Sequence, residues 1–314
     1  MTPARLAWLD AARGAALIPM ALYHGAWDLS LLGWIETDIG GHAGWTALAR
    51  ATTVCFLVIS GIGLALAARA GAGSGKALRR VGRIAAAAGL VSLATWWFAP
   101  ANMVVFGILH AIALGSLLAW PLRRAPDALL LALAGLVMAL PFLLRHPLFA
   151  GTAWAWLGLS PEPSAAFDHV PLLPWWGWML LGLVAGRRLP LGGAASPSPG
   201  LLARGLAWAG RRSLPIYLLH QPLFIGALTL AAHLAAPSPA ALREGWREAL
   251  RADCAAAGDP APVCAAYADC AIARLASEPG LLEAARRKRL SPSQRARFES
   301  VLDACEAEAG GAPR

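Results

Sequence analysis

The chain has 314 residues, of which 58% are hydrophobic and only 14% are charged, with a formal net charge of +9. A soluble domain has about 25% charged residues, so the composition excludes an ordinary water-soluble protein and indicates a polytopic membrane protein. The arginines stand mostly between apolar segments, where they set topology, and no basic and aromatic interleaving points to nucleic acid.

The first apolar segment, residues 7–31, is long enough to cross a bilayer but contains Asp10, Arg13, His24 and Asp28. These charges interrupt the uncharged stretch that a cleavable signal peptide needs. At about 100° per helical residue, the four side chains fall within roughly 60° of one another. Ionisable residues inside a membrane normally face the bundle interior or a water-filled cavity, so we expect the stripe to line a site.

Two pairs make up this stripe. Asp10 and Arg13 are one helical turn apart and can neutralise each other near the cytoplasmic end. His24 and Asp28 are also one turn apart, and a carboxylate there can fix the imidazole tautomer and raise its basicity. The alternative is that both pairs are structural and hold the helix in its bundle.

After this segment comes a short connection, "ETDIGGHAGW", which places His42 beside small residues and Trp45 at the expected membrane interface. A histidine there can reach an aqueous substrate. The apolar segment that follows contains "FLVISGIGLAL", whose small residues suit close helix packing.

Runs of about 20 apolar residues suffice to span the hydrocarbon core, and in lipid such runs form helices because every backbone polar group needs an internal partner. The sequence predicts seven of them, at residues 7–31, 45–69, 80–99, 103–121, 126–145, 171–189 and 212–235. Among the connections between these runs, those after the second, fourth and sixth hold nearly all of the lysines and arginines. The positive-inside rule therefore predicts a cytoplasmic N-terminus and an external C-terminus.

Polar side chains recur in later segments. The last run, "RRSLPIYLLHQPLF", places Ser213, Tyr217, His220 and Gln221 within an arc of about 100°. His110, in "FGILHAIAL", is a further histidine at mid-membrane depth. Each of the two histidines belongs either to a site or to a buried contact between helices.

The residues beyond 236 differ in character from the rest. They are polar, alanine-rich and helical in pattern, with two Ser-Pro helix starts. They contain Cys254, Cys264, Cys270 and Cys305, and an even number of cysteines in an exported segment indicates two disulfides with three connectivities open. Four reduced cysteines in a cytoplasmic tail are the alternative. No His or Cys spacing indicates a metal site.

The predicted fold class is therefore all-α. A polytopic integral membrane helix bundle of about seven transmembrane helices occupies residues 1–236, and a small extramembrane helical domain with four cysteines occupies residues 237–314.

Five stretches, in matching order over roughly residues 5–230, carry a resemblance to a known family: "RLAWLDAARGAALIPMALYHGAWDL", "CFLVISGIGLAL", "FGILHAIAL", "WWGWMLLGLVAGR" and "RRSLPIYLLHQPLF". Together they resemble bacterial members of the heparan-alpha-glucosaminide N-acetyltransferase catalytic-domain family. The lysosomal relative takes acetyl-CoA from the cytosol and acetylates a terminal glucosamine on the luminal side.

The resemblance also suggests site residues. The proposed catalytic histidine of the family lies in a His-Ala-small-Trp context, which "HAGW" at His42–Trp45 matches. His42 is thus the first catalytic candidate, and His24 with Asp28 is the second, from the helical stripe. Acetyl-CoA or another acyl-CoA is the implied co-substrate. The residues expected to line its path are Asp10, Arg13, His110, Tyr217, His220 and Gln221, with loop arginines such as Arg79 and Arg80 attracting its phosphates.

Together with the predicted topology, the resemblance implies an acyltransferase of the bacterial inner membrane with a periplasmic C-terminal domain. It would move an acetyl or acyl group from cytoplasmic acyl-CoA to a sugar amine or hydroxyl on the external side. Membrane lipid and a sugar or glycan acceptor are the expected partners, nucleic acid is not, and a homodimer is left open. Two alternatives remain: a transporter of a small solute along the stripe, and a structural membrane partner whose cysteine tail is the working part.

Overall fold

The computed structural model describes residues 7–32, 34–35, 37–162, 164, 166–189, 200–234, 239–278, 280–286 and 289–310. Contacts between Cα atoms divide the chain into two compact units. The first comprises the described residues up to Asp28 and those from Thr37 to Ile225; the second comprises Leu29–Glu36 and the residues from Gly226 onward. The boundary expected from the sequence, at residue 236, lies outside the described residues.

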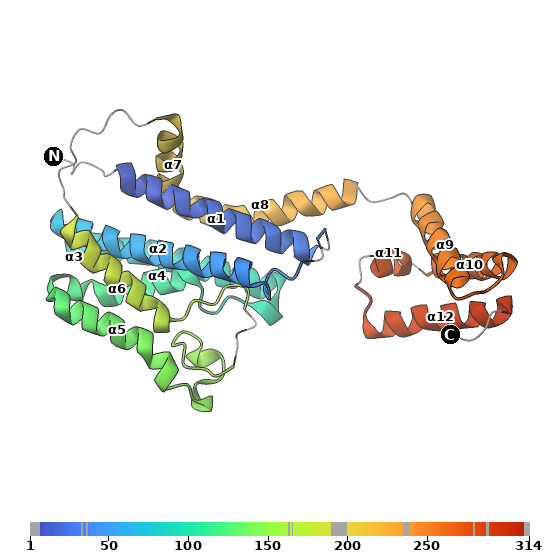
Figure 1. The fold of residues 1–314 in the computed structure, drawn as a ribbon. Helices are drawn as coiled ribbons and strands as arrows, with labels where there is room; N and C mark the ends of the chain where they lie inside the picture. Colours follow the sequence, from blue (N-terminus) through green and yellow to red (C-terminus); the bar gives the residue numbers. More distant parts are fainter. Residues whose placement is uncertain are drawn as a thin grey trace. The chain divides into compact units, whose positions relative to one another are not determined.

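Helices and short 3₁₀ turns make up the regular structure of the described residues (Figure 1). Eight α-helices precede the tail: α1 Ala7–Leu31, α2 Ala43–Arg69, α3 Ser74–Phe98, α4 Ile108–Ala119, α5 Asp127–Leu143, α6 Leu172–Arg188, α7 Leu201–Arg211 and α8 Ser213–Leu234. Each of the seven apolar runs overlaps one of these helices, although α2 and α3 begin before their runs, and α7 is an additional helix that the sequence did not indicate. The all-α class is confirmed.

Within the described residues, three helical stretches are long and apolar enough to cross a membrane by length and composition: Ala43–Arg69, Ser74–Phe98 and Ser213–Ala231. Helices α4 and α5 are apolar but shorter. Large apolar side chains also remain exposed on the helices, among them Trp97 at 76%, Phe98 at 83% and Phe142 at 82%. Such exposure is costly in water and suits lipid. The count of seven spans stays a prediction.

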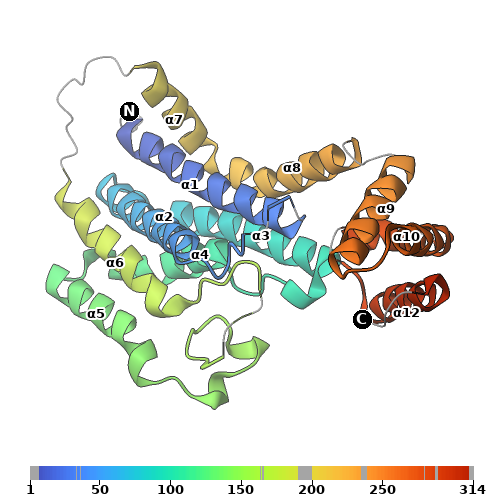
Figure 2. The same ribbon diagram turned by 45° about the vertical axis from the view of Figure 1, so that its right-hand side comes forward.

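Helix α6 packs between α2 and α5 (Figure 2). Glycines allow the approach to α2: a Cβ on Gly61 would lie 2.1 Å from the carbonyl oxygen of Met179, and one on Gly182 would lie 2.3 Å from that of Val58. Small residues at membrane helix interfaces let backbones meet in this way. At the other side of α6, Arg187 and Arg188 form ion pairs with Asp127 of α5 at 2.8 and 3.0 Å.

Helix α1 packs closely against α7. A Cβ on Gly14 would lie 2.0 Å from the carbonyl oxygen of Leu206, and one on Gly210 would lie 1.7 Å from that of Asp10. Side chains at either position would push the helices apart. The N-terminal half of α1 is therefore held next to the junction of α7 and α8.

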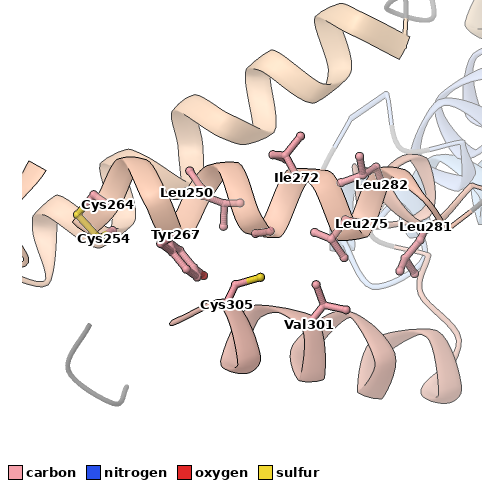
Figure 3. Close-up of a cluster of buried hydrophobic side chains, with 12 residues drawn as sticks. Leu250, Cys254, Cys264, Tyr267, Ile272, Leu275, Leu281, Leu282, Val301 and Cys305 are labelled. Atoms are coloured by element: carbon pink, nitrogen blue, oxygen red, sulfur yellow. A yellow bond between two sulfur atoms is a disulfide. The ribbon is translucent and has the colours of Figure 1, made fainter. Parts of the chain in front are cut away.

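The second unit contains a small helical domain of α9 Pro239–Ala256, α10 Ala261–Ala276, α11 Leu281–Arg286 and α12 Pro292–Ala309. Leu275, Val301 and other apolar side chains meet between its helices (Figure 3). Two disulfides, Cys254–Cys264 and Cys270–Cys305, are formed, which confirms their expected number and selects one connectivity. A Ser291 side-chain cap starts α12, and Gly310 in the left-handed region ends it.

Candidate functional site: an arginine-lined groove and an adjoining polar cluster

A groove of about 340 Å³ opens between six helices of the first unit, α1, α2, α3, α4, α7 and α8. Its lining includes Arg13 of α1, Arg80 and Arg83 of α3, and Arg211 at the end of α7. Among the described residues that line it, Asp10 is the one acid. We call this cavity the donor groove, after the role that we propose for it below. Its apolar wall comes from α2, α4 and α8, and Tyr217 of α8 is also part of the lining.

The expected ion pair at the start of α1 is formed. Arg13 Nη1 donates to Asp10 Oδ1 at 2.9 Å, with the Asp10 side chain almost buried. Arg13 also reaches across to α2, where a Cβ on Gly63 would lie 2.9 Å from its guanidinium. Because Asp10 and Arg13 both line the donor groove, their pairing positions a cation at its wall as well as stabilising the helix.

The other end of the stripe faces α8. The Asp28 side chain is fully buried, and its Oδ1 accepts a hydrogen bond of 2.6 Å from Gln221 Nε2. Asp28 Oδ2 has no hydrogen-bond partner among the described residues. The expected support of His24 by Asp28 is therefore not formed, because α8 supplies an amide donor that takes the carboxylate.

His24 instead meets a second histidine. Its ring lies 4.9 Å from that of His220, edge to face. The His220 ring lies 5.6 Å from that of Tyr217, and its Nε2 is buried without a partner among the described residues. These residues of α1 and α8 form what we call the polar cluster: His24, Asp28, Tyr217, His220 and Gln221. Tyr217 connects the cluster to the donor groove.

His110 is part of the polar cap of α4 rather than of this cluster. Its Nδ1 accepts from the Gly107 N–H at 3.2 Å, and its Nε2 lies 3.3 Å from Ser92 Oγ. Both ring nitrogens are thus engaged locally, which matches the alternative in which this histidine connects helices.

His42 lies at the N-terminus of α2, where its Nδ1 accepts from the Gly44 N–H at 3.2 Å. The side chain is exposed, and it lines neither the donor groove nor the larger cavity described below. His42 lies in the connection between α1 and α2, as the sequence predicts. The sequence did not predict that its side chain caps the N-terminus of α2.

A larger cavity of about 800 Å³ opens among the connections at the opposite ends of the helices. We call it the outer cavity. Its lining combines arginines and a histidine with indole rings: Arg50, Arg145, His169, Trp154, Trp175 and Trp178. Burial lowers the pKa of His169 from its ordinary value, which favours the neutral imidazole.

Asp168 lies beside His169 and was missed by the sequence reading. Its Oδ2 accepts from the Ile108 N–H at 2.8 Å, at the start of α4, and from the Tyr217 hydroxyl at 3.3 Å. Burial raises the pKa of this carboxyl, while the two donors act in the opposite direction. Asp168 lies in an irregular connection without periodicity, so only its place shortly before a span could have drawn attention to it.

The comparison with protein families gives one match, to the catalytic region of heparan-alpha-glucosaminide N-acetyltransferase, over residues 5–222. The chain belongs to this family. The resemblance to this family that the sequence showed is confirmed, and the family is one of membrane acetyltransferases. The match ends before the cysteine-containing tail and covers both the donor groove and the polar cluster. Neither the curated proteins nor the solved structures that were compared give a match.

Proposed function

We propose that the protein transfers an acetyl group from acetyl-CoA, bound in the donor groove, to an amine or hydroxyl of a sugar in the outer cavity. The observation that carries this proposal is the groove itself, which Arg13, Arg80, Arg83 and Arg211 line and whose α8 wall extends as far as Tyr217. Guanidinium groups bind phosphates through charge-assisted, often bidentate hydrogen bonds. The family favours this activity over solute transport.

The orientation of the two cavities supports transfer across a bilayer. The arginines of the donor groove lie near the start of α1, the start of α3 and the junction of α7 and α8, which are the ends joined by basic connections. The outer cavity lies near the start of α2, the end of α5 and the start of α6. By the positive-inside rule the donor side is cytoplasmic and the outer cavity external.

The outer cavity suits a sugar in both size and chemistry. Its volume of about 800 Å³ lies within the usual range for small-molecule sites. Indole rings such as Trp175 and Trp178 offer flat apolar surfaces on which the less polar face of a sugar ring packs. Arg50 and Arg145 supply hydrogen-bond donors for its oxygens.

In the transfer step, the acceptor nitrogen or oxygen attacks the thioester carbonyl carbon, the carbon–sulfur bond breaks, and the acceptor proton passes through a base to the CoA thiolate. A histidine is suited to that base. The polar cluster provides the His24–His220 pair next to the groove end at Tyr217. His42 is the alternative base that the family resemblance favours. Gln221 and Asp28 hold the two helices together around the pair.

The donor site is tested by acetyl transfer from acetyl-CoA to an amino sugar with the purified protein. Arg80→Ala and Arg83→Ala each remove a phosphate-binding guanidinium, and we expect the KM for acetyl-CoA to rise about tenfold, which corresponds to about 1.4 kcal/mol. Arg79→Ala is the matched control, because Arg79 is exposed on the same helix and does not line the groove. Equal KM values for all three variants would contradict the assignment.

The base is tested by His24→Ala, His220→Ala and His42→Ala in the same assay. The proposal expects kcat to fall by about 10²–10⁴-fold in the variant that removes the base. Loss confined to His42→Ala would transfer the role to that residue. Full activity in all three variants would exclude a histidine base.

A further inference from the structure

Two irregular connections separate the donor groove from the outer cavity. The segment 102–107, before α4, hydrogen-bonds the segment 166–171, before α6: Phe167 N–H donates to Asn102 O at 3.1 Å, and Val170 N–H donates to Phe106 O at 3.0 Å. Met103 and Val105 of the first segment, with His169 and Pro171 of the second, line the outer cavity. Ile108, which follows the first segment, lines the donor groove.

Packed apolar side chains fill the layer behind these connections. Leu57, Phe106, Val170 and Met179 belong to one buried cluster, and Tyr217 packs partly against it. An acetyl group that passes from one cavity to the other must therefore cross at the edge of this layer. Asp168 of the second segment hydrogen-bonds two residues that line the donor groove, Ile108 and Tyr217.

Asp168 joins three parts of the first unit. One carboxylate oxygen accepts from the backbone of Ile108 and from the Tyr217 hydroxyl, both of which line the donor groove. Gly107 lets the Asp168 carboxylate approach the start of α4, because a Cβ on residue 107 would lie 2.2 Å from the same oxygen. From α1, Tyr23 lies within electrostatic reach of the carboxylate.

We propose that Asp168 is a positioning residue for the transfer step, holding Tyr217 at the end of the donor groove where the two substrates meet. This inference rests on the function proposed above. Reacting atoms must approach to about 3–3.5 Å, and a displacement of about 1 Å can cost 10²-fold in rate. The carboxylate fixes the Tyr217 ring relative to α4, so that the ring supports the thioester beside His220. Asp168 acts through Tyr217 and not on the reacting atoms.

The test measures kcat and KM for acetyl-CoA, with an amino sugar as acceptor, in Asp168→Ala, Asp168→Asn, Tyr217→Phe and the Asp168→Ala/Tyr217→Phe double variant. We expect Asp168→Ala and Tyr217→Phe each to lower kcat about 10–100-fold. The KM should change less than about threefold, because the guanidinium groups that bind the phosphates remain. The double variant should be no slower than either single variant, since both break the same contact.

Asp168→Asn is the conservative rescue, because its amide oxygen still accepts from Ile108 and Tyr217; it should keep most of the wild-type kcat. Phe167→Ala is the control in the same connection, since its side chain is 42% exposed and lines neither cavity. Wild-type kcat in Tyr217→Phe, multiplied losses in the double variant, or a raised KM with unchanged kcat would each overturn the positioning role.

A second measurement separates this inference from the proposed function. Thermal unfolding of the same variants without substrate reports the coupling between Asp168 and Tyr217 in the absence of catalysis, and the shifts in Tm should be non-additive. Additive shifts would overturn the inference even where the enzyme is active. Non-additive shifts in a protein that transfers no acyl group would contradict the proposed function, and the catalytic role of Asp168 with it, while leaving the contact in place.

Discussion

Asp28 and Gln221 show how single side chains hold the two polar helices together. A buried carboxylate is costly unless it is hydrogen-bonded, and Asp28 has Gln221 as its partner across α1 and α8. Each of the two residues also has one buried oxygen without a partner among the described residues. The pair is therefore only partly satisfied, and substrate or water can complete it at the site.

Gln221→Leu removes the one described donor to Asp28 while keeping the side chain bulky. Leaving a buried acceptor unsatisfied costs about 1–3 kcal/mol, so we expect a lower Tm in detergent. Leu219→Ala, at a position on the same helix that is 56% exposed, should change Tm much less. Equal shifts in the two variants would show that the Asp28–Gln221 hydrogen bond does not stabilise the bundle.

The raised pKa of Asp168 predicts a pH dependence of stability. Burial favours the protonated carboxyl, so the folded pKa lies above the unfolded value of about 3.9. The stabilising contribution of the protonated form is present below that value and is lost as pH rises through the folded pKa. The groups that face the carboxyl are Tyr23 of α1, Tyr217 of α8 and the Ile108 N–H of α4.

Asp168→Asn cannot ionise and should not show this loss. We therefore expect the Tm of the wild type to fall relative to that of Asp168→Asn as pH is raised from about 4 toward neutrality. Differential scanning measurements of both proteins in one detergent provide the comparison. If the Tm difference between the wild type and Asp168→Asn is constant over this range, the hydrogen bonds from Ile108 and Tyr217 offset the effect of burial on the pKa of Asp168.

At the scale of helices, glycine contacts control how closely α2 and α6 pack. Gly182→Ala would place a methyl group 2.3 Å from the backbone oxygen of Val58, so we expect a loss of about 1–3 kcal/mol and a lower Tm. Gly89→Ala is the matched control, because a Cβ there meets open space in the middle of α3; it should be neutral or stabilise by up to about 1 kcal/mol. Destabilisation by the control alone would contradict this packing.

The helices were largely predictable from sequence, because lipid forces backbone groups to pair within each segment. The polar stripe of α1 was predictable for the same reason, as was the ion pair of Asp10 with Arg13. The partners of Asp28 and His24 could not be predicted. Gln221 and His220 lie about 190 residues further along the chain, and no local sequence pattern specifies which helices become neighbours. Asp168 and His169 lie in a connection whose conformation depends on tertiary contacts.

At the scale of the whole molecule, the disulfides bear on topology. Disulfides persist in oxidising compartments and are rare in the cytosol, so Cys254–Cys264 and Cys270–Cys305 support the proposal that the tail is external. In a Cys55→Ser background, which removes the free thiol, a membrane-impermeant maleimide should label intact cells only after reduction. Labelling that requires permeabilised cells would reverse the proposed topology.

The larger disulfide loop should also stabilise the tail. Cys270–Cys305 closes a separation of 35 residues, and a disulfide of this size contributes about 2–4 kcal/mol. Cys270→Ser/Cys305→Ser should therefore lower the unfolding temperature of the tail, measured in the full chain, without changing acetyl transfer. Loss of transfer in this variant would show that the tail takes part in the activity.

In the function proposed here, acetyl-CoA enters from the arginine side and the acceptor is acetylated on the opposite side. Proteoliposomes of uniform orientation, with labelled acetyl-CoA on one face and an amino sugar on the other, test it directly. We expect labelled sugar when acetyl-CoA is supplied on the face of the basic connections and little product from the reverse arrangement. Arg80→Ala should give less product at subsaturating acetyl-CoA. Equal product from both arrangements, or none from either, would contradict the proposed function.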